Sequence, residues 1–115
     1  MRVETGDGLW ALKILSRRAV AQPNGRARLE RAEVVARLAA EAGIPAMTAQ
    51  PGPNDCFLQD VADRTVVLYP WREGHVLPPH AVSPAVAAQM GGYLARLHAL
   101  KIRFPDQEPP VPEAF

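Results

Sequence analysis

The sequence predicts an α+β fold, in which an antiparallel sheet carries one long packed helix. Two segments, residues 3–15 and 56–69, each place a turn between two strand-like runs, which is the pattern of a β-hairpin. Between them, residues 26–42 are rich in Ala, Leu, Arg and Glu, and their apolar residues recur at helical spacing. A chain of 115 residues is long enough to form one such domain around a single core.

The first hairpin turns at Gly6-Asp7-Gly8, between a short strand at residues 3–5 and a longer one at 9–15. A lone two-stranded ribbon is only marginally stable, so we expect it to belong to a larger sheet. A second hairpin is predicted from the strand-like runs at 56–61 and 65–69.

The long helix has a clear beginning and end. Pro23-Asn24-Gly25 opens it, and Gly43 followed by Pro45 closes it. One face is charged, and the other is an apolar stripe that we expect to lie on the sheet. This stripe consists of Ala32, Val35, Leu38, Ala39 and Ala42.

A break follows the second hairpin at Pro70-Trp71-Arg72-Glu73-Gly74 and leads into a Pro-rich loop. Ser83 and Pro84 then offer an N-cap and a first-turn proline for a second helix that runs to about His98. Several prolines beyond Phe104 rule out a continuous helix there and are typical of a linker. The chain thus divides into residues 1–69, a connection at 70–82, the second helix at 83–100 and a Pro-rich tail at 101–115.

The composition argues against several classes of protein. A formal net charge of +1 gives no excess of basic residues of the kind that binds nucleic acid. The same low charge disfavours a winged-helix DNA-binding protein. The single cysteine, Cys56, excludes an internal disulfide and fits a cytoplasmic location. No run of residues is long and apolar enough to span a membrane. His75 and His80 have no clear third ligand, so we expect no metal site.

Lys13 is the most informative residue, because it interrupts an apolar strand where burying an unpaired ammonium would be costly. Strand alternation places Ala11 on the same face as Lys13. A small residue beside a cation leaves room for a flat ligand whose phosphate meets the lysine. The alternative is an edge-strand lysine that extends into water.

Two acids near the start of the long helix, Glu30 and Glu33, are candidates to pair with Lys13. We favour Glu30, which lies nearer the helix start. Each acid, taken alone, is also explained as a solvated residue that favours the positive end of the helix dipole.

The segment that begins at Tyr69 is a candidate for recognising a purine edge. Pro70 offers a backbone carbonyl without an N–H, whereas Arg72 offers both groups, so the two residues would accept from and donate to one base. An ordinary strand-to-helix connection is the alternative.

Taken in order, these segments resemble the N-terminal lobe of the aminoglycoside phosphotransferase and choline kinase superfamily, whose fold is similar to that of protein kinases. The resemblance covers roughly residues 3 to 100. It is carried by Ala11-Leu12-Lys13, by residues 31–38 with the helix exit at 42–45, by the strand and hinge at 66–74, and by residues 90–98.

This resemblance implies binding of ATP and transfer of its γ-phosphoryl group to a hydroxyl of a small molecule. Lys13 would grip the phosphates, with Glu30 or Glu33 orienting it, and Ala11 would lie beneath the adenine. The implied nucleotide-binding residues are Ala11, Lys13, Glu30, Tyr69, Pro70 and Arg72.

Two parts of the family pattern do not appear in the sequence. The first strand and phosphate-covering loop would precede Val3, and the catalytic loop and metal-binding Asp would follow His98. We therefore expect a truncated phosphotransferase with no catalytic residue of its own, in which Mg²⁺ joins ATP only where the second lobe is present. The alternative is a non-catalytic interaction module that self-associates through apolar residues of its second helix, namely Val86, Met90, Leu94 and Leu97.

Overall fold

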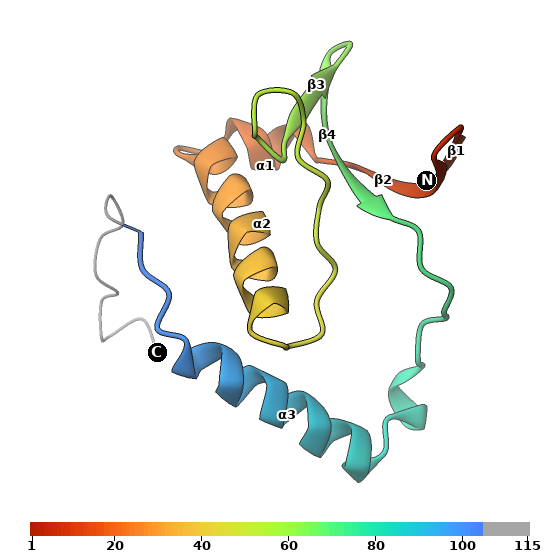
Figure 1. The fold of residues 1–115 in the computed structure, drawn as a ribbon, viewed down its shortest axis with the longest axis vertical. Coiled ribbons are helices and arrows are strands. Elements are labelled where there is room, and N and C mark those ends of the chain that lie inside the picture. The colour runs from red at the N-terminus through yellow and green to blue at the C-terminus, as the bar shows by residue number, and fades with distance from the viewer. Residues whose placement is uncertain (105–115) are drawn as a thin grey trace.

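A computed structural model describes residues 1–104 of the chain as a four-stranded antiparallel sheet with a long helix beside it (Figure 1). The strands are β1 (Arg2–Thr5), β2 (Gly8–Ile14), β3 (Gln59–Val61) and β4 (Arg64–Pro70). The helices are α1 (Arg17–Ala21), α2 (Gly25–Glu41) and α3 (Pro84–Ala99), with a short 3₁₀ turn at Pro79–Ala81. The predicted α+β fold is confirmed.

The sheet has the strand order β1-β2-β4-β3. Both predicted hairpins form, and β2 pairs with β4 to join them into one sheet. The first strand of the second hairpin is shorter than predicted, because it begins at Gln59 rather than Cys56. The backbone N–H groups of Phe57 and Leu58 donate to a side chain of α2 instead of to a neighbouring strand.

A short helix that the sequence pattern did not predict, α1, connects β2 to α2. The Ser16 side chain caps it by accepting the N–H of Ala19. α2 then begins at Gly25, where a Cβ would stand 2.3 Å from the carbonyl oxygen of Ala19. Glycine at this position therefore allows the two helices to meet closely.

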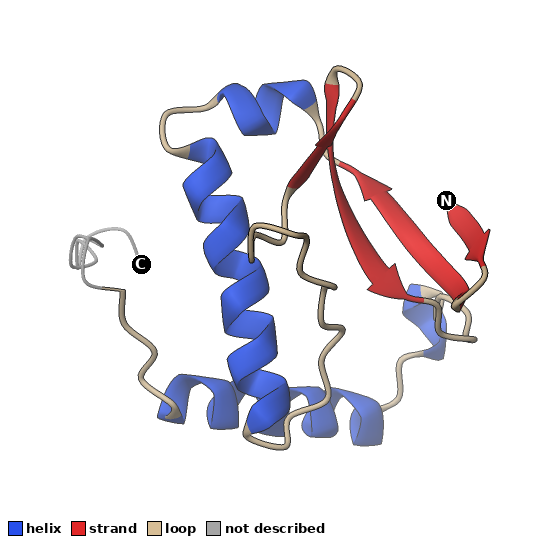
Figure 2. Cartoon of the chain, turned by 45° about the horizontal axis from the view of Figure 1, so that its top comes forward, coloured by secondary structure: helices blue, strands red, loops and turns tan. Residues whose placement is uncertain are grey.

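The buried core lies between the sheet and α2 and includes residues of the loop that joins α2 to β3, which runs between the helix and the sheet in Figure 2. α2 packs against the core through Leu29 and Val34. The core itself consists of Leu15, Ala49, Phe57, Leu58 and Val67.

The predicted alanine-rich stripe of α2 faces the sheet only in part, which corrects the expectation above. Ala32 lines a cavity shared with the sheet, whereas Val35 and Ala39 line an apolar cavity of about 350 Å³ between α2 and α3. Small residues let a second helix approach, while the larger Leu29 and Val34 fill the space above the sheet.

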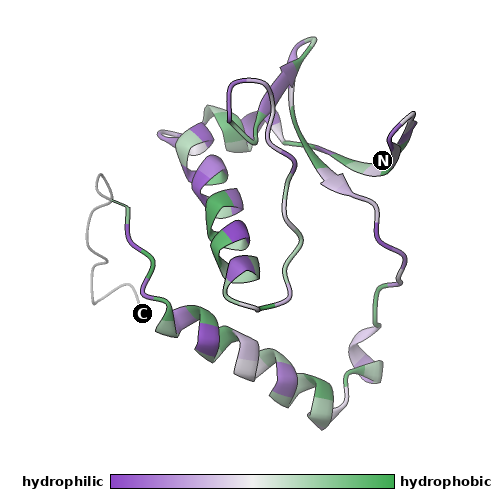
Figure 3. Ribbon diagram, in the orientation of Figure 1, coloured by the Kyte–Doolittle hydropathy of each residue, from purple (hydrophilic) through white to green (hydrophobic). Residues whose placement is uncertain are grey.

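α3 begins as predicted, with the Ser83 side chain accepting the N–H of Val86 and Pro84 in the first turn. The helix lies near the C-terminal end of α2 in both ribbon views (Figures 1 and 2). There the Arg96 guanidinium donates to the carbonyl oxygen of Ala42 at 3.4 Å. Colouring by hydropathy shows apolar residues along α3 as well as along α2 (Figure 3).

Within residues 1–104, no helix has the length and apolar character that crossing a bilayer requires. From residue 105 onward, the predicted Pro-rich tail lies outside the described residues.

Candidate functional site

A cavity of about 370 Å³ lies between the sheet and α2. In the sheet register, Ala11 of β2 is opposite Tyr69 of β4, and Lys13 is opposite Val67. Alternate residues of a strand share one face, so Ala11, Lys13 and Tyr69 all face α2. The cavity is lined by Ala11, Lys13, Ala32, Glu33, Ala36, Met47 and Tyr69.

Lys13 contributes a positive charge to this cavity and is exposed to solvent. The ion pairs formed within residues 1–104 are Arg17–Asp63 at 2.5 Å and Arg26–Asp60 at 3.0 Å, and neither involves Lys13. The ammonium group beside the small Ala11 is therefore available for an anionic ligand.

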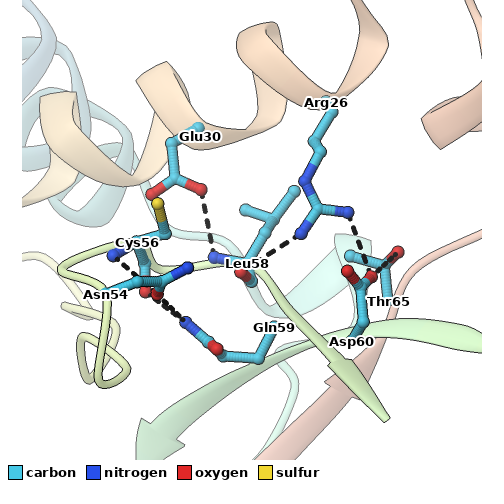
Figure 4. A network of polar contacts seen from close by, with 8 residues as sticks. All are labelled: Arg26, Glu30, Asn54, Cys56, Leu58, Gln59, Asp60 and Thr65. Atoms are coloured by element: carbon cyan, nitrogen blue, oxygen red, sulfur yellow. Dashed lines mark hydrogen bonds and ion pairs between the residues drawn. The ribbon is translucent and has the colours of Figure 1, made fainter. Parts of the chain in front are cut away.

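Neither Glu30 nor Glu33 forms an ion pair with Lys13 within residues 1–104, so the preference for Glu30 as its partner stays a prediction. In the structure Glu30 has other partners. Its carboxylate accepts the backbone N–H groups of Phe57 at 2.5 Å and Leu58 at 3.1 Å. Figure 4 shows Glu30 reaching toward Leu58 from α2. Glu30 thus has a structural role, because it satisfies the amides that precede β3.

Arg26, one turn before Glu30, binds the same segment from the same face of α2. Its guanidinium donates to the carbonyl oxygen of Leu58 at 3.4 Å and to the Asp60 carboxylate at 3.0 Å (Figure 4). The hydrogen bonds from Arg26 and then from the Thr65 hydroxyl lower the pKa of Asp60. Together, Arg26 and Glu30 attach the segment from Phe57 to Asp60 to α2.

Glu33 is the acid that shares the cavity with Lys13. Its Oε1 accepts a hydrogen bond from the hydroxyl of Tyr69. Burial, followed by the hydrogen bond to Glu33, raises the pKa of Tyr69 well above its usual range. The Tyr69 side chain therefore stays protonated at neutral pH and donates to Glu33.

Sequence reasoning placed Tyr69 at the hinge but missed its hydrogen bond to Glu33. The two residues are 36 positions apart in the chain, and no local pattern connects them. Only the packing of α2 against β4 brings them together.

The hinge begins with β4 still paired to β2. The N–H of Trp71 donates to the carbonyl of Leu9 in β2 at 3.2 Å. Successive residues of a strand direct their backbone groups to opposite edges, and alternate residues direct them to the same edge. The carbonyl of Pro70 therefore faces the other edge of β4, where the Leu68 carbonyl accepts the N–H of Gln50. Arg72 follows two residues later and is exposed.

The Trp71 ring is occupied by contacts within the chain. Its Nε1–H donates to Glu73 at 3.0 Å, and the Arg2 guanidinium lies 5.7 Å from the ring centroid. Trp71 therefore serves as a packing residue of the hinge.

In the described part of the chain, the His, Cys, Asp and Glu side chains form no group of three that would hold a metal ion. The candidate site is the Lys13 ammonium beside a small cavity between the sheet and α2.

Comparison with curated proteins and with solved structures gives no match. A family model, in contrast, matches residues 1–115, and it describes the phosphotransferase enzyme family. This match confirms the resemblance carried by the lysine strand, the long helix, the hinge and the second helix. The chain belongs to the phosphotransferase enzyme family.

Proposed function

We propose that this chain is the nucleotide-binding lobe of a phosphotransferase that moves the γ-phosphoryl group of ATP to a hydroxyl of a small molecule. The observation that carries the proposal is the Lys13 ammonium, which lies without an ion pair in the described part of the chain and lines a 370 Å³ cavity beside Ala11. A cavity of about this volume is of ligand-binding size.

Charge and shape support a nucleotide as the ligand. A phosphate would form a charge-assisted hydrogen bond with the Lys13 ammonium. The small side chain of Ala11 leaves space for a flat base, with the apolar Met47 nearby in the cavity lining. The backbone groups of Pro70 and Arg72 would then meet the edge of the adenine.

Residues 1–104 would bind the nucleotide, and phosphoryl transfer would take place in the intact enzyme. Transfer requires a group that positions the acceptor hydroxyl and Mg²⁺ that neutralises the developing charge. An aminoglycoside, an amino alcohol or a sugar would be a suitable acceptor.

The two lysines of the chain, Lys13 and Lys101, allow a matched test. Calorimetric titration with Mg-ATP should show that Lys13→Met weakens binding about tenfold or more, because a charge-assisted hydrogen bond to phosphate contributes about 1.5–3 kcal/mol. The control Lys101→Met should bind like the parent chain. Equal affinities for the parent and Lys13→Met would refute the proposed site.

Adenosine provides an independent check on the phosphate contact. The parent chain should bind ATP more tightly than adenosine, and this preference should shrink in Lys13→Met. A preference for ATP that survives the substitution would mean that another group binds the phosphates.

A second candidate function, self-association through α3, is favoured by two exposed apolar residues. Met90 is 60% exposed and Leu94 is 53% exposed on this helix. Sedimentation equilibrium should then show dimers that Met90→Ser with Leu94→Ser converts to monomers. A monomeric parent chain at high concentration would exclude this function.

A further inference from the structure

A cavity of about 420 Å³ lies where the chain leaves α3 and returns beside α2 (Figures 1 and 2). At the end of α3, the N–H of Lys101 donates to the carbonyl of His98 at 3.2 Å, and Lys101 takes a left-handed backbone conformation with a φ of 52°. Three residues later, the ring of Phe104 lies 5.6 Å from the guanidinium of Arg31 in α2. The cavity is therefore bordered by α2, the end of α3 and residues 101–104.

Part of the cavity lining is apolar. It comes from half-buried side chains of α2, of α3 and of the returning segment, namely Val35, Leu97, Ile102 and Phe104. Removing such apolar surface from water is favourable, so this part of the lining would stabilise the apolar body of a ligand.

The rest of the lining is basic and consists of His98, Lys101 and Arg103. Neither of the ion pairs formed within residues 1–104 involves these side chains. Among the same described residues, no acid lines the cavity. A lysine ammonium and an arginine guanidinium are strong hydrogen-bond donors to a carboxylate, and the forked guanidinium matches its two oxygens.

This cavity lies on a different side of α2 from the cavity of Lys13. Val35 lines the first, whereas Glu33 lines the second. Two positions along an α-helix correspond to a rotation of about 200° about its axis, so these side chains leave the helix in nearly opposite directions. A ligand in the new cavity would therefore not contact Lys13.

We propose that this cavity binds a small carboxylate that carries an apolar ring, at a site separate from that of the nucleotide. The carboxylate binds Lys101 and Arg103, and the ring contacts Ile102 and Phe104. An inorganic anion would leave the apolar lining exposed to water, and a neutral ring compound would leave the cations without a partner. The volume of the cavity is near the lower end of the range of about 300–1,000 Å³ that is usual for ligand pockets, which favours a small ligand.

Phenylpropionate is the probe that tests this proposal. Titrated into the nitrogen-15-labelled full chain, it should shift the amide signals of residues 97–104. Acetate has the same head group without the ring, and phenylpropanamide has the ring without the charge, so each should bind about tenfold more weakly or less. Equal affinity for either compound would overturn the proposal, as would shifts confined to the exposed apolar residues Met90 and Leu94.

The two cations provide the second part of the test. Both are exposed, so replacing them should leave the fold intact. Lys101→Met combined with Arg103→Gln should weaken phenylpropionate binding about tenfold or more, because two charge-assisted hydrogen bonds are lost. Arg28→Gln, at an exposed arginine of α2, is the matched control and should stay within about twofold of the parent. A double variant that binds like the parent would overturn the proposal.

The chain also has carboxylates of its own beyond the described residues, at Asp106, Glu108 and Glu113. Replacing all three by their amides, Asp106→Asn, Glu108→Gln and Glu113→Gln, should leave the affinity for phenylpropionate within about twofold of the parent. A rise of about tenfold would mean that these acids compete for the cavity, and it would overturn the proposal of a separate ligand.

Mg-ATP separates this site from the proposed nucleotide site. Lys13→Met should bind phenylpropionate like the parent, and saturating Mg-ATP should not displace the probe. Displacement by Mg-ATP would mean that both ligands share one site and would overturn the proposal. If Lys13→Met fails to affect ATP binding, the nucleotide site is wrong, while the phenylpropionate titrations still decide whether the second site exists.

Discussion

Glu30 accepts the backbone N–H of Leu58 at 3.1 Å across the junction between α2 and the start of β3. The same carboxylate accepts the N–H of Phe57. One acidic side chain thus replaces the strand partner that these two amides lack. This contact connects the second hairpin to the helix that forms the other wall of the cavity.

Replacing Glu30 by Ala should destabilise the fold by about 2 kcal/mol, because hydrogen bonds to a charged group contribute about 1.5–3 kcal/mol and two buried amides would lose their acceptor. Urea unfolding monitored by circular dichroism measures the change. Glu41→Ala, at an exposed acid in the last turn of α2, is the control and should be close to neutral. Equal effects of the two substitutions would contradict the role of Glu30.

Gly25→Ala should destabilise the chain by about 1–3 kcal/mol, because the new methyl group would stand 2.3 Å from the carbonyl oxygen of Ala19. Gly91→Ala in α3 is the matched control, since a Cβ there meets nothing within 4 Å. It should stabilise the helix by up to about 1 kcal/mol. The same unfolding experiment compares them, and a neutral Gly25→Ala would show that α1 does not meet α2 this closely.

The Tyr69 hydroxyl should titrate well above the usual tyrosine value of about 10, because burial and the hydrogen bond to Glu33 favour its neutral form. Tyr69 and Tyr93 are the two tyrosines of the chain, so ultraviolet absorbance of Tyr93→Phe follows Tyr69 alone. Glu33→Gln in that background should lower the midpoint part of the way. A midpoint near 10 in the folded protein would contradict the buried hydrogen bond.

The stability of the chain should depend on this group at alkaline pH. The pKa of Tyr69 is higher in the folded state than in the unfolded state, so its contribution is complete below about pH 10 and is lost as pH rises further. The difference in unfolding free energy between the parent and Tyr69→Phe should therefore be constant from pH 7 to 9 and decrease above pH 10. A difference that grows above pH 10 would have the wrong sign.

Asp60 should affect stability at the acidic end of the pH range. Its pKa is lowered in the folded state by the hydrogen bonds from Arg26 and Thr65, so its contribution is present above about pH 4 and is lost as pH falls further. The stability difference between the parent and Asp60→Asn should shrink between pH 5 and 2. Because Asp60 is exposed, added salt should also reduce the stability difference between the parent and Asp60→Asn at pH 7. A difference that changes with neither pH nor salt would argue against the ion pair between Arg26 and Asp60.

Local sequence patterns predicted the hairpins, the long helix and the start of α3, because turn residues and caps act over a few positions. They did not predict how α2 is rotated about its own axis. That rotation decides whether Glu30 or Glu33 shares the cavity with Lys13, and it depends on how Leu29 and Val34 pack on the core. The contact between Glu33 and Tyr69 was missed for the same reason, since packing between distant segments creates it.

The contact between Arg96 and the carbonyl of Ala42 connects α3 to the C-terminal end of α2, far from the residues that hold the start of α2. The N-terminal part of α2 is held by the close contact of Gly25 with α1 and by the bonds of Glu30, whereas at its far end the Ala42 carbonyl accepts from Arg96 of α3. At about 1.5 Å per residue, Glu33 lies about 4.5 Å beyond Glu30 and Ala42 lies about 18 Å beyond it. If α2 pivots near Glu30, a sideways displacement of Ala42 would reach Glu33 reduced to roughly a quarter, so the acid beside Lys13 would move much less than the end of α2 that contacts α3.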